Sequence, residues 1–340
     1  MSSPEISPMP SPELFWETVN AYQRTQVLKA AIELDAFTAI AEGADTPAAL
    51  AQRVGGTERA VRILMDHLTV LGFLTKSGGR YALTPDTSAF LDRRSRIYLG
   101  GVLHFMHQPT MLDGFGTLAQ AIRTGRTTLQ GEGSVDPENP VWVDFAQAMK
   151  PMMGLPAELI ANTLNIKAAG RCRVLDIAAG HGMFGITMAL HNPQAEITAL
   201  DWRAVLAVAR ENAQKTGVAD RFHERVGSAF EVDFGTGYDV VLLTNFLHHF
   251  DKPTCEGLLR KVHAALKPGG RVATLEFVPN EDRISPAQAA VFATIMLATT
   301  VSGDAYTFGE YQRMFANAGF ARCELHELPP TPQRLVVSHK

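Results

Sequence analysis

The spacing of apolar positions changes along the chain. Between residues 13 and 105, apolar residues recur every three to four positions, which predicts a run of helices. From residue 171 onward, short apolar runs alternate with segments of helical spacing, which predicts alternating strands and helices. The pattern therefore divides the chain into an all-α domain over 13–105, a helical connector over 106–165 and an α/β domain over 166–340.

The N-terminal domain has the pattern of a winged helix. Segment 13–37 has apolar residues at helical spacing, and segments 46–55 and 57–73 each begin with a threonine that predicts a helix N-cap. Segment 74–84, LTKSGGRYALT, predicts two short strands joined at Ser77-Gly78-Gly79. The order helix, helix, hairpin is that of winged-helix domains.

A winged helix is compatible with DNA binding, which requires a second helix that presents polar residues to the groove. Here the helix predicted over 57–73 has apolar residues around nearly its whole circumference, which predicts a buried helix. These residues are Val61, Ile63, Leu64, Met65, Leu68, Val70 and Leu71. Packing against a second subunit is the better interpretation, so we expect a homodimer and no nucleic-acid partner. A DNA-binding regulator is the weaker alternative.

The connector over 106–165 is rich in methionine and aromatic residues, and GEGSVDPENP (131–140) predicts a loop within it. Most of these side chains are expected in an ordinary core. A minority are expected to line a pocket, because methionine adapts to flat apolar ligands.

The C-terminal half predicts a doubly wound parallel sheet with helices on both faces. The last two strands are close enough to form a hairpin, so we expect the final strand to be antiparallel. Strands are predicted at 173–179, 196–201, 221–228, 238–247, 271–278, 321–328 and 333–340, with a turn at 267–270. Helices are predicted at 183–192, 202–217, 253–266, 286–300 and 307–318.

Composition narrows the setting in which the protein works. The net charge of −4 gives no electrostatic reason to expect nucleic acid or an anionic membrane. The three cysteines lie far apart, which argues against a disulfide framework or a zinc site, so no metal is expected. Residues 1–12 are rich in serine and proline and predict a disordered lead-in, and no stretch has the apolar length of a membrane span. We therefore expect a cytoplasmic protein without a membrane partner.

The run 174–182, VLDIAAGHG, ends a predicted strand in an acid, Asp176, and a glycine-rich turn. Residues 180–185 match G-x-G-x-x-G, and Asp201 follows Gly182 by 19 residues, as in dinucleotide sites. However, a pyrophosphate is bound best by backbone N–H groups and a helix N-terminus, without a carboxylate beside it. Asp176 therefore favours a cofactor with cationic groups, such as the ammonium and sulfonium of S-adenosylmethionine (SAM). An NAD-dependent dehydrogenase is the alternative.

With these features the chain resembles class I SAM-dependent methyltransferases, and in particular the O-methyltransferase family that includes plant caffeate-type enzymes and bacterial tailoring enzymes. The resemblance covers almost the whole chain and implies a seven-stranded Rossmann-like sheet behind a winged-helix dimerisation domain. The family loop is acid-x-Gly-x-Gly-x-Gly, and Ala178 replaces its first glycine. Alanine lacks only the freedom for positive φ, so the loop is preserved if Ala178 has ordinary dihedrals.

Further matches imply the cofactor site. Asp201-Trp202 matches the family's ribose-binding acid and the apolar neighbour of adenine, and LKPGG (266–270) matches the turn before the fifth strand. In Gly227-Ser228-Ala229-Phe230, a serine stands where the family has an acid that contacts adenine. The implied cofactor is SAM, with S-adenosylhomocysteine as its product. The expected cofactor-binding residues are Asp176, Gly180, Gly182, Asp201, Trp202, Ser228, Ala229, Phe230 and Asn245.

The resemblance implies a general base in NFLHHFD (245–251), where His248 takes the family position and His249 is its competitor. A neutral imidazole can remove the proton of a phenol as its oxygen attacks the methyl group. Glu276 matches a family glutamate that flanks the histidine, and a solvated strand end is the alternative interpretation. At the family's second flanking glutamate the chain has Ala305, with Asp304 beside it and Glu310 beyond. This departure leaves open a relative that binds SAM but performs non-methyl chemistry, a hydroxylase or pericyclase.

The family pattern also implies an acceptor pocket, expected to hold a small aromatic, polyketide-like substrate with a hydroxyl group. Its candidate residues are Phe145, Met149, Met153, His249, Met296 and Thr300. The function predicted from the sequence is a SAM-dependent O-methyltransferase of secondary metabolism, with His248 and Glu276 as catalytic residues.

Overall fold

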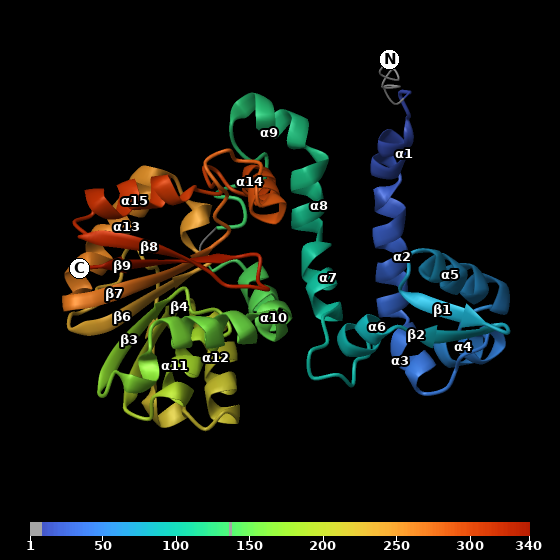
Figure 1. Ribbon diagram of the computed structural model, residues 1–340, viewed down its shortest axis with the longest axis horizontal. Coiled ribbons are helices and arrows are strands. Elements are labelled where there is room, and N and C mark those ends of the chain that lie inside the picture. Colours follow the sequence, from blue (N-terminus) through green and yellow to red (C-terminus); the bar gives the residue numbers. More distant parts are fainter. Residues whose placement is uncertain (1–8, 136–137) are drawn as a thin grey trace, which may run out of the picture. The chain divides into compact units, whose positions relative to one another are not determined.

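The computed structural model describes residues 9–135 and 138–340 (Figure 1). The chain divides into two compact units, Met1–His104 and Phe105–Lys340. Residues 1–8 of the predicted lead-in lie outside the described residues, as do two residues of the loop predicted over 131–140.

The N-terminal unit consists of short helices and one hairpin. Segment 13–37 forms separate helices, since Asn20 ends the first and Asp35, at φ 55°, precedes the third. The hairpin pairs Leu74 with Leu83 and turns at Gly78 and Gly79, both at positive φ, which confirms the predicted strands. The elements are α1 (Glu13–Val19), α2 (Ala21–Glu33), α3 (Ala36–Ala41), α4 (Pro47–Val54), α5 (Glu58–Val70), β1 (Leu74–Ser77), β2 (Arg80–Leu83) and α6 (Pro85–Phe90).

Helix α5 is not buried around its circumference, and that expectation is wrong for the single chain. Val61, Met65 and Leu68 are buried in the core of the unit. Ile63 is 45% exposed and Val70 is 84% exposed. The helix is therefore amphipathic, and its apolar residues on the other side face outward.

The second unit begins near the end of α7 (Gly100–Met106) and contains a seven-stranded sheet. Its order is β5-β4-β3-β6-β7-β9-β8, with β9 antiparallel to both neighbours and the first five strands parallel, which confirms the predicted fold class. The strands are β3 (Cys172–Ile177), β4 (Ala195–Asp201), β5 (Phe222–Val226), β6 (Tyr238–Thr244), β7 (Leu266–Glu276), β8 (Arg322–Glu327) and β9 (Arg334–His339). The helices are α8 (Pro109–Gly116), α9 (Leu118–Thr124), α10 (Val141–Thr163), α11 (Met183–His191), α12 (Arg203–Lys215), α13 (Lys252–Ala265), α14 (Ala287–Thr299) and α15 (Phe308–Asn317), with short 3-10 turns at Ile166–Ala168, Ala219–Arg221 and Leu247–His249.

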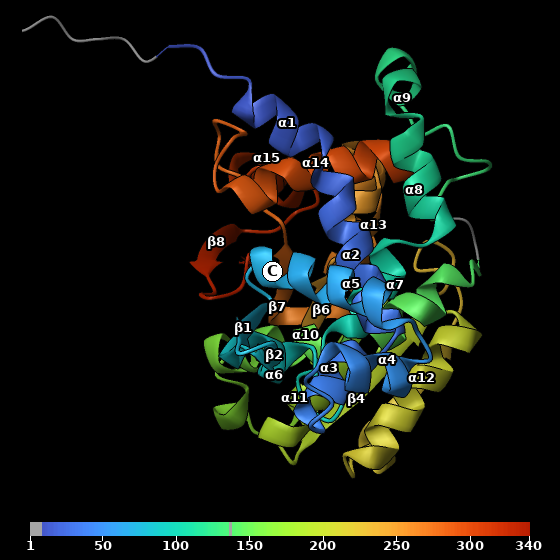
Figure 2. The same ribbon diagram turned by 90° about the vertical axis from the view of Figure 1, so that its right-hand side faces the viewer.

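Side chains alternate between the two faces of this sheet, as strand geometry requires. Val174 packs into the core shared with α10, α11 and α12, whereas Leu175 packs into the core shared with α13 and α15. Figures 1 and 2 both show α11 and α12 on one side of the sheet and α13 and α15 on the other. This alternation determines toward which face of the sheet each acidic side chain at a strand end points.

The turn predicted at 267–270 lies within β7. Tyr238 pairs with Leu266 and Val240 pairs with Arg271, so the intervening residues form a bulge in the strand. Gly269, at φ 75°, provides the backbone conformation that this bulge needs. The chain therefore does not change direction in this segment, and the strand continues through it.

Candidate active site

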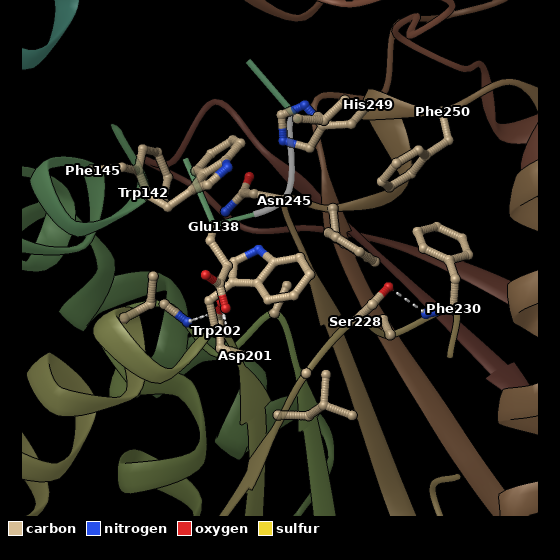
Figure 3. A pocket seen from close by; sticks show the side chains of 18 of the residues that line it. Glu138, Trp142, Phe145, Asp201, Trp202, Ser228, Phe230, Asn245, His249 and Phe250 are labelled. Carbon is tan, nitrogen blue, oxygen red and sulfur yellow. Dashed lines mark hydrogen bonds between the residues drawn. The ribbon is translucent and has the colours of Figure 1, made fainter. Parts of the chain in front are cut away.

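A cavity of about 450 Å³ lies at the carboxyl ends of the central strands, where doubly wound sheets bind their ligands. Figure 3 shows Trp142, Phe145 and His249 around one part of it, with Ser228 and Phe230 across from Trp142 and Phe145. The predicted site residues that line it are Phe145, Gly180, Asp201, Trp202, Ser228, Ala229, Phe230, Asn245 and His249.

The loop after β3 takes a left-handed conformation at the replaced glycine. Ala178 has φ 55°, and Gly180 and Gly182 have φ 57° and 75°. The condition of ordinary dihedrals at Ala178 is therefore not met, and alanine is strained there. Gly182 is needed for packing as well, since a Cβ on it would lie 2.9 Å from the Cβ of Ala209.

The structure corrects the expected place of Asp176. Its carboxyl group is fully buried, does not line the cavity, and accepts a hydrogen bond from the Gly185 N–H of α11 at 3.0 Å. Strand alternation explains this, since Asp176 shares the face of Val174, which packs toward α11. Burial raises the pKa of Asp176 to about 8, while the Gly185 bond opposes the rise. Its Oδ1 is buried without a hydrogen-bond partner among the described residues.

Asp201 ends β4 and does line the cavity. Its Oδ2 accepts the N–H of Gly180 at 2.9 Å and its Oδ1 accepts the N–H of Trp202 at 2.7 Å. Burial raises the pKa of Asp201 to about 6, and these two backbone bonds oppose that rise. The carboxylate therefore ties the loop after β3 to the end of β4 at the cavity wall.

The side chains of two other predicted cofactor residues form hydrogen bonds within the protein and also face the cavity. The Ser228 hydroxyl accepts the N–H of Phe230 at 3.2 Å (Figure 3). Asn245, at φ 53°, accepts a hydrogen bond from the Gln333 side chain at 2.6 Å. Both side chains keep a surface on the cavity.

His248 and Glu276 form a buried pair. The His248 Nδ1 is hydrogen-bonded to Glu276 Oε2, and the exposed fractions of the two side chains are 5% and 0%. Glu276 Oε1 accepts the N–H groups of Phe246 and Leu247 at 3.0 and 2.9 Å. The alternative of a solvated strand end is therefore wrong for Glu276. An acceptor at Nδ1 fixes the ring tautomer and leaves Nε2 with its lone pair.

His249, and not His248, lines the cavity. Its ring lies edge-on to Trp142, with 5.2 Å between centroids, and 4.2 Å from the ring of His248. Burial, and then the electrostatic interaction with the neighbouring His248, lower the pKa of His249 well below its usual range. Its Nδ1 is buried without a partner among the described residues, so nothing there orients it as Glu276 orients His248.

No acid takes the place of the second flanking glutamate among the described residues near His248. Ala305 is buried, and the Asp304 carboxylate accepts the N–H of Ala305 at 2.8 Å. Glu310 pairs with Lys252 and Arg283, both at 2.7 Å, and caps α15. Glu310 thus has a structural role at the start of the helix.

Four predicted pocket residues do not line this cavity. Met153 and Met149 pack in or against the core under α10, and Met296 is buried. Thr300 is 1% exposed and bonds to the backbone at Met296 and Gly303. Helical spacing alone did not show which side of α10 faces inward.

Several lining residues were missed from the sequence. Trp142 could have been found, since it stands one helical turn before Phe145 in α10. Gly227, Phe246 and Phe250 lie within the motifs at 227–230 and 245–251. The others lie in the loop before α10 or outside any motif: Glu132, Val135, Glu138, Leu200, Val205, Glu231 and Thr244. Among the described lining residues there are four carboxylates (Glu132, Glu138, Asp201, Glu231) and no lysine or arginine.

This charge distribution suits a cationic cofactor better than a pyrophosphate. The volume also fits, since small-molecule pockets occupy roughly 300–1,000 Å³. The carboxylate of Asp201 is placed for a ligand at the end of β4. The residues present therefore fit SAM. In the parts of the chain that the structure describes, no group of three or more His, Cys, Asp or Glu is arranged to hold a metal ion.

Comparison with known proteins identifies the class. Residues 116–321 match the O-methyltransferase domain and residues 16–93 match the O-methyltransferase dimerisation domain. The chain belongs to this O-methyltransferase family, and it is a SAM-dependent enzyme. Across the described residues, no helix has the length and apolar character needed to cross a membrane.

Individual relatives agree along nearly the whole chain. It is 29% identical over 315 residues to 3-hydroxy-5-methyl-1-naphthoate 3-O-methyltransferase of Streptomyces sahachiroi, covering 91% of this chain and 89% of the relative. A crystal structure from Nostoc punctiforme PCC 73102, described as a candidate O-methyltransferase, is 52% identical with a TM-score of 0.94, covering 98% of this chain and all of the other. Human N-acetylserotonin methyltransferase in complex with SAM shares the fold, with a TM-score of 0.84, 23% identity, and coverage of 98% and 99%.

Proposed function

We propose that this enzyme methylates a hydroxyl group on an aromatic acceptor, with His248 as general base and Glu276 as the group that orients it. The observation that carries the proposal is the buried hydrogen bond between His248 Nδ1 and Glu276. A proposed base needs a fixed tautomer, and among the described residues only His248 of the two adjacent histidines has an acceptor at Nδ1.

Different residues are proposed to bind the cofactor and to remove the proton of the substrate. Asp201, Trp202, Gly180, Ser228, Ala229, Phe230 and Asn245 are proposed to bind the cofactor, because they line the cavity. Bound SAM supplies the methyl group and becomes S-adenosylhomocysteine, as the bond to sulfur breaks and the bond to the acceptor oxygen forms. A phenol with a pKa near 10 keeps its proton at neutral pH, so His248 Nε2 accepts that proton as the oxygen attacks. Glu276 stabilises the imidazolium that results.

A continuous series of ring contacts supports a flat aromatic acceptor. Successive centroids lie 4.1–5.7 Å apart, and both adjacent histidines are members of the series. Such ring faces and edges favour aromatic ligands. The series runs Phe105, Phe145, Trp142, His249, His248, Phe292 and Phe277. The naphthoate relative and the tetracenomycin polyketide synthesis 8-O-methyl transferase of Streptomyces glaucescens, 27% identical, support the same substrate class.

One observation favours a second candidate. Ala305 leaves His248 with a single acidic partner, so a SAM-binding relative with non-methyl chemistry is the alternative. Incubation with SAM carrying a trideuterated methyl group and a panel of phenols, naphthols and hydroxylated polyketides distinguishes the two by mass spectrometry. The proposal expects acceptor products that gain the labelled methyl group. Conversion of an acceptor without the label would favour the alternative.

We also infer that the protein is a homodimer through its N-terminal domain. The dimerisation-domain match and an exposed apolar face on α1 and early α2 support this. That face consists of Leu14, Phe15, Trp16, Val19 and Tyr22, which are 47–76% exposed. Light scattering after size-exclusion chromatography should give twice the chain mass of 37.0 kDa, and a concentration-independent monomer would contradict it.

A further inference from the structure

The loop that follows α9 is bonded to the C-terminal end of α14. Thr127 donates from its N–H to Thr300 O at 3.0 Å and from its hydroxyl to Ala298 O at 2.6 Å. Ser134 donates from its N–H to Thr299 O at 2.9 Å. The last carbonyls of a helix have no partner within the helix, so this loop caps α14 from outside.

The approach of the loop is close enough to require glycine. Gly133 pairs with Thr300 as an isolated bridge and has φ 72°. A Cβ on Gly133 would lie 2.4 Å from Thr299 O. Thr127 is 4% exposed, so its hydroxyl bond to Ala298 is buried.

The capped end of α14 leads directly to the backbone of His248. The Thr300 hydroxyl donates to Met296 O at 2.7 Å and accepts the N–H of Gly303 at 2.9 Å. A Cβ on Gly303 would lie 2.3 Å from His248 O, and the N–H of Asp304 donates to the same oxygen at 2.9 Å.

His248 is thus held from two sides. Glu276 binds its ring and the backbone just before it, while the Asp304 N–H binds its carbonyl and Gly303 packs closely against that oxygen. The loop that caps α14 also reaches the cofactor cavity, since Glu132 and Val135 line it. The part of the loop that bonds to the end of α14 through Gly133 and Ser134 therefore also meets the cavity.

We propose that Thr127 and Thr300 are positioning residues for His248, acting through the capped end of α14 and residues 303–304. The inference rests on the proposed role of His248 as base. Neither threonine lines the cavity, so neither is expected to contact the cofactor. Their contribution is to keep the imidazole at the distance and angle at which it accepts the proton.

The test compares Thr127→Val, which removes the hydroxyl at similar volume, with Thr127→Ser, which retains it. Because small misplacements of a catalytic group are costly, we expect kcat of Thr127→Val to fall about tenfold, with little change in KM for the acceptor or Kd for SAM. Thr127→Ser should recover most of kcat. Thr124→Val is the matched control, because the Thr124 hydroxyl is exposed and bonds to carbonyls at Gln120, Ala121 and Arg126.

A double-mutant cycle separates this inference from the proposed function. If Thr127 acts through His248, Thr127→Val should cost no further activity in a His248→Asn background. An unchanged kcat in Thr127→Val, or an equal loss in both backgrounds, would overturn the positioning role. A His248→Asn variant with wild-type kcat would instead overturn the proposed base. Should Thr127→Val not fold, Thr300→Val and Thr300→Ser carry the same cycle.

Discussion

Two strand ends of the same sheet use buried acids in different ways. At the end of β3, Asp176 turns toward α11, accepts the Gly185 N–H and has no surface on the cavity. At the end of β7, Glu276 turns toward the segment after β6 and holds an imidazole. Both carboxyl groups are fully buried. A strand-end acid therefore acquires its role from the face it points to and the group it meets there.

The largest effect is expected at the end of β7. In Glu276→Gln, the amide oxygen can still accept the N–H groups of Phe246 and Leu247, but the amide nitrogen then faces His248 Nδ1. The ring is driven to the tautomer with a proton on Nε2, so Nε2 can no longer take the proton of the substrate hydroxyl. We expect kcat to fall about 10²- to 10⁴-fold, as for loss of a general base, with SAM affinity nearly unchanged.

Steady-state kinetics with saturating SAM measures this effect, and calorimetry gives the Kd. Glu327→Gln is a matched control on β8, where the carboxylate is exposed and pairs with Arg334. A Glu276→Gln variant that turns over at the wild-type rate would show that the buried pair is structural.

Asp201 is expected to affect binding instead of turnover. Asp201→Asn places an N–H₂ group against one of the backbone N–H donors at Gly180 and Trp202. Loss of charged hydrogen bonds should raise Kd for SAM about 10- to 100-fold, while kcat at saturation changes little.

The pKa of Asp201 adds a pH test. Since burial raises it to about 6, the carboxylate becomes protonated as the pH falls through 6, and wild-type affinity for SAM should weaken there. Asp201→Asn should lack this dependence, whereas the exposed Asp220→Asn should retain it. An identical pH profile in Asp201→Asn would assign the titration to another group.

Asp176 is expected to affect the stability of the cofactor-free protein. Its folded pKa is raised to about 8 from 3.8, so the unfolded chain loses this proton first and stability falls as the pH rises from about 4 to 8. Asp176→Asn keeps an acceptor for Gly185 and removes the titration. At pH 8 we expect the free energy of unfolding of Asp176→Asn to exceed that of wild type by at least about 1 kcal/mol. At pH 4 we expect the difference between the two proteins to be much smaller. Urea unfolding at both pH values measures the difference, and a pH-independent loss of stability would contradict it.

The smallest effect is expected at Ala178. Glycine is free to adopt φ 55°, so Ala178→Gly should relieve strain, although the more flexible unfolded chain offsets part of the gain. We expect the free energy of unfolding to rise by about 0.5–1 kcal/mol. Thermal unfolding measures it, with Ala229→Gly as a comparison at a position without positive φ.

Much of the fold follows from the sequence, because strand and helix periods differ and caps mark the helix starts. The threonines at 46 and 57 cap their helices, and the hairpin turns at its two glycines. The outward apolar residues of α5 were misassigned because a single helix does not show which neighbours cover it. Glycine and proline mark both turns and bulges, so the pattern at 267–270 predicts a turn where the strand has a bulge.

The sequence predicts where in the fold the site lies, but it predicts less well which way the individual side chains point. Asp201 and Ser228 line the cavity as the motifs predict, and the partner of His248 was found through its match to the family. The direction of Asp176 follows from its sharing a strand face with Val174, a signal that the motif obscured. Thr300 and Met296 could not be placed, because their roles depend on the loop that caps α14 and comes from a distant part of the chain.

The most direct test of the central claim compares His248→Asn with His249→Asn in single-turnover transfer of a labelled methyl group at saturating SAM. The account predicts that His248→Asn lowers the rate constant at least about 10²-fold, with Kd for SAM close to wild type. His249→Asn should retain a much larger share of the rate. Wild-type transfer by His248→Asn, with the loss falling on His249→Asn instead, would contradict the assignment of His248 as the base.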